Sequence, residues 1–545
     1  ASVDQDNNAA VTQNLVADNT CDGTGTHSAE CGNGAALNTI AGITQSNNAQ
    51  EELDAISTQF NNAVISQDMT LLNDCEEGDL GTNDADCENF NPANVIGPIT
   101  QISANEAGAE ALSATAAQSN DVEITQNLQS VNACDEQGDS DNIAGCLNSA
   151  VNLIDIITQT NTADDVADDF VQTNLIGVIN QDLQATNNCD DTDADVVGDG
   201  VNDAACGNQV GNFIGPMQGA VLQTNTATGT EVTDVSQNNE ISNMNQVLRA
   251  GNDCDQSGPG DNLAECSINA PNFGPPITQT NSATGDSFTD FLQDNDAAFS
   301  QTLDLGNNCD ATTSAAVRNN EIDCLLSAEN FIDPIAQANS ATGEFDASID
   351  QDNNAAVTQN LVADNRCSAT GTNTAECLIT DAANGAGNGG ISQSNTADDE
   401  LDASSAQFNN AVVAQNLVLL NDCDETGSEG NSAFCQFFEP ENLIGPITQS
   451  SFNEAGAQAD GATIDQSNDA QSSQNLQATN DCDESEAGDN SATCASLANN
   501  FIDSINQANS ANVGDDFVQN NLVAISQELQ ATNNCDETGD GDNGV

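Results

Sequence analysis

The chain has 545 residues, of which 87 are acidic and only 3 are basic, so its formal net charge is −84. This balance excludes nucleic acid and anionic membrane surfaces as partners, because both need clustered lysine or arginine. There is no lysine, tyrosine or tryptophan and only one histidine, His27, so most catalytic chemistry lacks its usual groups and we expect no enzyme.

The charge and the hydropathy also predict the surroundings of the chain. Dense carboxylates repel one another unless salt or divalent cations screen them, which favours a salt-rich or cation-rich medium. The alternative is a surface that only prevents aggregation in ordinary salt. No apolar segment approaches the ~20 residues of a membrane-spanning helix, so we expect no membrane insertion. The N-terminal residues Ala1–Asp4 do not resemble a signal peptide.

Self-comparison shows a repeat of about 58 residues instead of the three or four domains that length alone suggests. Each unit opens on a phrase of the type Ile-Thr-Gln, continues through two further glutamines and closes with a cysteine loop. Residues 1–19 recur at 347–365 with one substitution, which indicates duplication of a six-unit block. The predicted units are 1–42 (partial), 43–98, 99–156, 157–220, 221–276, 277–334, 335–390, 391–446, 447–504 and 505–545 (partial).

Both ends of the chain fall inside a unit. Self-contained repeat proteins usually end in polar capping units. We therefore expect either a window on a longer array or a protomer whose open ends join its neighbours.

The middle of each unit alternates with period two, which predicts strands with one buried and one wet face. An example of the inward series is Gln293, Asn295, Ala297, Phe299, Gln301, Leu303, Leu305, Asn307 and Cys309. Buried amides are costly unless they are hydrogen-bonded, and stacking identical rungs lets each amide bond to its copies above and below. The predicted core ladder comprises Gln5, Gln13, Gln59, Gln67, Gln118, Gln126, Gln293, Gln301, Gln351, Gln359, Gln407, Gln415, Gln466, Gln474, Gln519 and Gln527.

The fold predicted from this pattern is an all-β solenoid with stacked Gln/Asn ladders and one disulfide-closed loop per unit. Each unit is expected to supply two or three coils. The alternative is a string of small β-sandwich domains, for which about 58 residues is short.

The spacing Asn-x-Ala-x-x-x-Gln, seen in residues 61–67 and 353–359, resembles the curlin repeat. That resemblance implies an extracellular, amyloid-like fibre of stacked β-arches with inward amide ladders. Curlin units are shorter, lack cysteines and are richer in glycine at the arches, so only the fold and the fibre are carried over.

Nineteen cysteines are spread along the chain, about two per unit. Their spacing predicts nine local disulfides: Cys21–Cys31, Cys75–Cys87, Cys134–Cys146, Cys189–Cys206, Cys254–Cys266, Cys309–Cys324, Cys367–Cys377, Cys423–Cys435 and Cys482–Cys494. Cys535 remains: either its partner lies just beyond residue 545 in a longer chain, or Cys535 is bonded to another molecule, or it is unpaired. Zinc is not expected, because Cys-x2-Cys spacings are missing, and disulfides indicate an oxidising, extracellular compartment.

The cysteine loops are acidic, as in residues 135–142 and 536–543. Clustered carboxylates suit Ca²⁺, although no loop has the EF-hand spacing. We assign no cofactor and no metal site. The acidic loops either bind calcium or other divalent cations from the medium, or they are simply solvated by water.

These features predict an extracellular structural protein that polymerises with itself, head to tail, into a filament, sheath or biofilm matrix. The alternative is an adhesin stalk or a cation-binding repeat protein of the cell surface.

Overall fold

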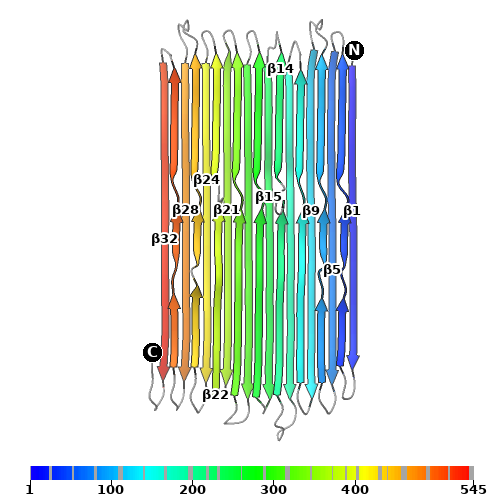
Figure 1. Ribbon diagram of the computed structural model, residues 1–545, viewed down its shortest axis with the longest axis vertical. Helices are drawn as coiled ribbons and strands as arrows, with labels where there is room; N and C mark the ends of the chain where they lie inside the picture. Colours follow the sequence, from blue (N-terminus) through cyan, green and yellow to red (C-terminus); the bar gives the residue numbers. More distant parts are fainter. Residues whose placement is uncertain are drawn as a thin grey trace.

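The computed structural model describes residues 2–23, 28–51, 55–78, 83–107, 114–138, 142–164, 169–193, 201–215, 220–229, 234–258, 261–285, 290–313, 319–343, 347–370, 372–386, 390–399, 404–426, 432–438, 440–455, 463–485, 491–512 and 516–538. All regular structure in these residues is β, and it forms three parallel sheets. Figure 1 shows the strands side by side along one axis, with the N-terminal and C-terminal rungs at opposite ends of the stack.

Sheet A contains one long strand from every unit, because alternation runs through the middle of the unit, with register shifts at Ile176/Val178 and at Ile241/Met244. Its ten strands, in spatial and chain order, are β1 (Ser2–Gly23), β5 (Ala55–Gly78), β9 (Ala114–Gly138), β12 (Phe170–Asp193), β15 (Asp234–Gly258), β18 (Asp290–Thr313), β21 (Ser348–Thr370), β24 (Ser404–Thr426), β28 (Thr463–Ser485) and β32 (Asp516–Thr538).

The chain returns in the opposite direction through sheet B, which begins near the second cysteine of each unit. Its thirteen strands are β2 (Ser28–Asn33), β3 (Leu37–Ile40), β6 (Asn83–Asn89), β7 (Ala93–Ile96), β10 (Asn142–Ile154), β13 (Val201–Ile214), β16 (Asp261–Gly274), β19 (Asn319–Ile332), β22 (Thr372–Ala386), β25 (Ser432–Phe438), β26 (Glu441–Ile444), β29 (Ser491–Ser496) and β30 (Asn499–Ile502).

Sheet C continues the return path and holds the Ile-Thr-Gln phrases. Its nine strands are β4 (Ile43–Glu51), β8 (Ile99–Ala107), β11 (Ile157–Asp164), β14 (Val221–Gly229), β17 (Ile277–Gly285), β20 (Ile335–Gly343), β23 (Ile391–Asp399), β27 (Ile447–Ala455) and β31 (Ile505–Asn512). In most units a two-residue break separates sheets B and C; it is longer between Ile214 and Val221 and between Ala386 and Ile391. A Cβ atom at Gly42 in this corner would lie 2.6 Å from the Pro98 carbonyl oxygen of the next rung.

One unit is one coil of the solenoid, and the expectation of two or three coils per unit is wrong. Gln5 pairs directly with Gln59, and Cys21 pairs with Cys75, in the parallel register of β1 and β5. One strand of 22 to 25 residues in sheet A and the return path through sheets B and C together use the whole unit in a single coil. The molecule is thus a two-layer β-solenoid in which sheet A faces sheets B and C, and the alternative of separate sandwiches is excluded.

The core between the layers alternates apolar columns with polar ones. The predicted inward series from Gln293 to Cys309 is buried throughout, which confirms the period-two interpretation. Isoleucines such as Ile99 and Ile157 form one apolar column, and leucines such as Leu71 and Leu303 form another. A third column consists of the cysteines with small alanines. Identical residues therefore stack on identical residues along the axis.

Candidate functional site

Two glutamine ladders run the length of sheet A. In the first, the Gln59 side chain donates to Gln5 (3.1 Å) and the Gln118 side chain donates to Gln59 (3.0 Å). In the second, Gln67 donates to Gln13 (3.0 Å) and Gln126 donates to Gln67 (2.9 Å). The same bonds continue to Gln519 and Gln527 at the far end.

The structure places all sixteen predicted ladder glutamines on the inner face of sheet A. The ladders also include four glutamines of the repeat that were not assigned to them: Gln172, Gln181, Gln237 and Gln246. They occupy the same repeat positions as Gln118 and Gln126, so the repeat itself could have assigned them to the ladders.

Sheet C holds a third glutamine ladder that the sequence interpretation missed. It comprises Gln45, Gln101, Gln159, Gln223, Gln279, Gln337, Gln393, Gln449 and Gln507, joined at 2.7 to 3.0 Å. The repeated Ile-Thr-Gln phrase shows that these glutamines belong to the repeat. The phrase is too short to show by alternation which face of its strand is buried.

Asparagines connect the two layers. The Asn174 amide donates to Asn225 across the layers (3.0 Å) and to Asn239 along the axis (2.9 Å), while Asn225 in turn donates to Asn239 (3.1 Å). Each sheet C strand lies level with the gap between two sheet A strands, because Gln159 donates to the carbonyls of both Asn120 and Leu175. The amides therefore lock both the register along the axis and the stagger between layers.

Gln359 illustrates the density of this bonding. Its amide nitrogen lies 2.9 Å from the Gln301 side-chain oxygen and 3.0 Å from the carbonyl oxygens of Asn330 and Gly385. Its own oxygen accepts from Gln415 at 2.8 Å. A buried amide so fully satisfied adds specificity of register without leaving an unpaired polar atom.

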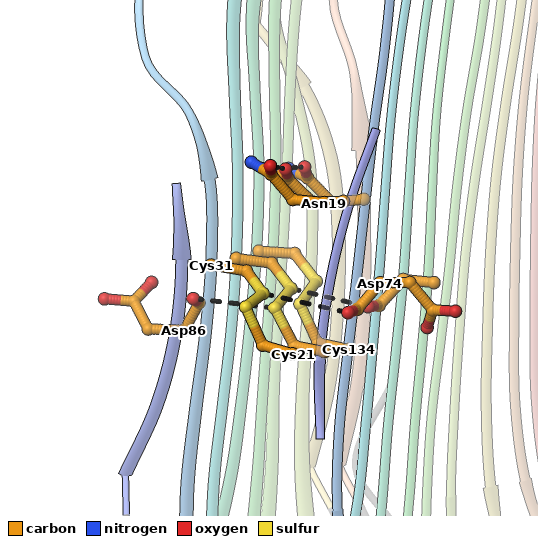
Figure 2. The surroundings of a disulfide bond; sticks show 12 residues. Asn19, Cys21, Cys31, Asp74, Asp86 and Cys134 are labelled. Carbon is orange, nitrogen blue, oxygen red and sulfur yellow. Dashed lines mark hydrogen bonds between the residues drawn. A yellow bond between two sulfur atoms is a disulfide. The ribbon is translucent and has the colours of Figure 1, made fainter. Parts of the chain in front are cut away.

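The cysteines form one continuous column of sulfur atoms between sheets A and B (Figure 2). Five of the nine predicted pairs are present: Cys21–Cys31, Cys75–Cys87, Cys134–Cys146, Cys367–Cys377 and Cys423–Cys435.

The remaining pairing differs from the prediction. Sheet B cysteines bond to the sheet A cysteine of the following unit in Cys206–Cys254, Cys266–Cys309 and Cys494–Cys535, so Cys535 is bonded within the chain. The predicted pairs Cys189–Cys206, Cys254–Cys266, Cys309–Cys324 and Cys482–Cys494 are therefore wrong, and Cys189, Cys324 and Cys482 are buried thiols. Stacking gives each sheet B cysteine two neighbours, one on either side along the axis, and sequence spacing shows only one of them.

The stacking also brings sulfurs of different units together in threes. The sulfurs of Cys75, Cys87 and Cys134 all lie within 4.8 Å of one another, and so do those of Cys189, Cys206 and Cys254. Metal-binding motifs read along one chain segment do not reveal such groups, because their members come from neighbouring rungs.

The outer faces carry columns of carboxylates. Burial, followed by the charges of Asp296 and Asp352, raises the pKa of Asp294 to about 7. Burial and neighbouring carboxylates likewise raise the pKa of Asp255, Asp352 and Asp422 to about 6. Stacked parallel strands place like charges on adjacent rungs, about 4.8 Å apart, so each carboxylate resists ionisation of the next.

Few cations balance these columns in the part of the chain that the structure describes. Arg249 lies 3.2 Å from Asp182 and Arg366 lies 2.7 Å from Asp364, both on the surface. Arg318, His27 and much of the acidic cysteine loops, including residues 139–141 and 539–545, lie outside the described residues.

The two ends of sheet A are open edges among the described residues. β32 pairs only with β28, and β1 pairs only with β5. The side chains of β32 that belong to the inner face are exposed, including Phe517 (62%), Ile525 (55%) and Leu529 (48%). This edge therefore presents apolar side chains together with unpaired backbone groups.

No family model, curated protein or solved structure matches this chain, so the resemblance to curlin repeats stays a prediction. Within the described residues there is no helix long and apolar enough to cross a membrane.

Proposed function

We propose that this chain is a structural subunit of an extracellular filament, sheath or biofilm matrix, in which copies stack end to end. The observation that carries the proposal is the match between its two open edges. β32 offers Gln519, Gln527 and Cys535 in the same columns in which β1 offers Gln5 and Cys21 at the other end of the stack. A second copy placed with its β1 beside β32 continues every ladder of sheet A.

Physical chemistry favours this contact. An open parallel edge is a template for another strand, and stacked amides repeat the bonds already made in the body. Addition also covers Phe517, Ile525 and Leu529, and burial of apolar area contributes about 25 cal/mol per Å².

The contact between two copies differs in one respect from the contacts between units within a copy. Sheet A has ten strands and sheet C has nine, so a joint through β32 and β1 leaves one strand position in sheets B and C that the described residues do not fill.

The outer carboxylates and the disulfides support an extracellular role. Eight disulfides are compatible with an oxidising compartment. The acidic faces oppose sideways association of filaments, and divalent cations from the medium would neutralise them and allow bundling.

The test compares two lysine substitutions on neighbouring residues of β32. Ile525→Lys places a charge in the inner-face column of the edge, whereas Ala524→Lys places the same charge on the outer face. Both residues are exposed in the single copy, so neither variant should lower its melting temperature by much.

We expect Ile525→Lys to reduce filament mass, measured by sedimentation and electron microscopy, by at least about tenfold, which corresponds to 1.4 kcal/mol of lost association energy. Ala524→Lys should assemble like the unmodified chain. Equal assembly of the two variants, or isolated rods in every sample, would contradict the proposal and favour a monomeric stalk.

A further inference from the structure

The cysteine column contains changes of pairing register. From Cys21 to Cys146, each sheet B cysteine bonds within its own unit, and at Cys206 the partner becomes the next unit. The pattern switches back at Cys367 and switches again at Cys494. The three thiols, at Cys189, Cys324 and Cys482, lie at these switches.

At the last switch a buried thiol lies beside a disulfide. The Cys494 sulfur is bonded to Cys535 and lies only 2.7 Å from the Cys482 sulfur. Cys482 is completely buried, whereas Cys494 and Cys535 are partly exposed at the end of the stack. The attacking and accepting sulfurs are therefore already in contact.

We propose that Cys482, Cys494 and Cys535 form a thiol–disulfide exchange site that delivers a thiolate to the open edge of sheet A, for covalent linkage to the Cys21–Cys31 disulfide of a second copy. The linkage rests on the proposed end-to-end stacking, whereas the exchange does not.

The first step needs no oxidant. Cys482 loses its proton to solvent and attacks the Cys494 sulfur; the Cys482–Cys494 bond forms, the Cys494–Cys535 bond breaks, and Cys535 leaves as a thiolate. The number of disulfides is unchanged. The new pair lies within one unit, as five of the eight disulfides already do.

The second step occurs between copies. When β1 of a second copy lies beside β32, Cys21 of that copy occupies the next sheet A position in the column after Cys535. The Cys535 thiolate attacks this sulfur, the bond from Cys535 to Cys21 forms, the Cys21–Cys31 bond breaks, and Cys31 leaves as a thiolate that solvent protonates. One disulfide is again exchanged for another.

Alkaline pH favours the first step. Burial, and then the charge of Asp481, raises the pKa of the Cys482 thiol to about 12; Asp422 of β24 and Asp483 act in the same direction, and a backbone hydrogen bond involving Cys435 opposes them. Burial, Asp481, Asp424 and Asp536 of β32 in turn raise the pKa of Asp483 at the same end of the stack. The attacking thiolate is therefore scarce at neutral pH, and its amount rises about tenfold per pH unit.

The exchange is tested on the dispersed chain in low salt. Samples held at pH 7 and pH 9 without reductant are quenched in acid, unfolded and labelled with a maleimide, and the disulfide-linked peptides are mapped by mass spectrometry. We expect label on Cys482 at pH 7, and at pH 9 label on Cys535 together with a Cys482–Cys494 link. Cys189 and Cys324 are labelled at both pH values and serve as internal references. Label that stays on Cys482 at pH 9, with none on Cys535, would overturn the exchange.

Two variants separate this site from the other buried thiols. Cys482→Ser should leave Cys535 bonded to Cys494 and unlabelled at pH 9, whereas Cys324→Ser, which removes a buried thiol elsewhere in the column, should leave labelling of Cys535 unchanged. Loss of the Cys535 label in both variants would contradict the assignment.

The linkage is tested on assembled material by non-reducing gel electrophoresis after incubation at pH 9. The unmodified chain should give covalent dimers and higher species, and Cys535→Ser should give filaments without them. Filaments of the unmodified chain that carry no covalent links would overturn the linkage. Absence of filaments from both samples would instead count against the proposed function, while the peptide map still judges the exchange.

Discussion

At the scale of single residues, the inner amides decide register and the outer carboxylates respond to the medium. Gln359 contacts two neighbouring ladder glutamines and two carbonyl oxygens of the opposite layer, whereas Asp352, on the same strand, points outward. The two residues therefore test the division between an inner and an outer face.

Replacing Gln359 by leucine should lower the free energy of unfolding by about 3 kcal/mol, because several buried polar groups lose their partner at roughly 1–3 kcal/mol each. Asp352→Asn should be neutral or slightly stabilising, since it removes one of several repelling carboxylates. Denaturant titration of both variants measures the difference. Equal losses would show that the ladder does not hold the fold.

The burial of individual side chains was the feature most fully predictable from the sequence. Unbroken alternation fixed the face on which Gln293 and Gln301 lie, and a buried amide in a repeat has few ways to be satisfied other than a ladder. The ladder through Gln159 was missed because its strand is only eight residues long and alternation there is brief. The cysteine pairing was predicted only in part, since Cys206 lies between Cys189 and Cys254 and spacing along the chain favours the nearer residue in sequence.

At the scale of elements, strand length explains the one prediction of fold that was wrong. Two or three coils per unit would need strands of ordinary length, about 5–6 residues. The inward series from Gln5 to Cys21 already shows one uninterrupted strand, and the corresponding element, β1, has 22 residues. A return path split between sheets B and C then completes a single coil.

Sheet A is a parallel sheet whose outer face is exposed to solvent. Parallel sheets are usually covered on both sides. Here every strand of sheet A except β1 and β32 has a parallel neighbour from the repeat on each side. Among the described residues, sheets B and C have no strand beyond β31 to cover β32, which is why the inner face of β32 is exposed.

At the scale of the whole molecule, stability should depend on pH through the carboxylate columns. Folding raises the pKa of Asp294 to about 7 and those of Asp255, Asp352 and Asp422 to about 6. A raised pKa means that the folded state holds protons that the unfolded state has already lost. The resulting stabilisation is complete below the ordinary pKa of 3.8 and is lost as the pH rises through about 6 and 7.

We therefore expect the melting temperature to rise by several degrees between pH 8 and pH 5. Asp294→Asn should flatten part of this dependence and stabilise the chain at pH 8, whereas Asp304→Asn, at an exposed position of the same strand, should change it little. Calcium or magnesium at pH 8 should produce a similar stabilisation. A melting temperature that falls on acidification over this range would contradict the electrostatic account.

Units of this chain stack in register, and we propose that copies continue the stack. The stacking is tested most directly by electron microscopy, with fibre diffraction, of the non-reduced chain in cation-rich medium. We expect filaments with a strong axial repeat near 4.8 Å. Flexible beads without the 4.8 Å repeat would contradict the fold, and rods of single-copy length under every condition would contradict the assembly.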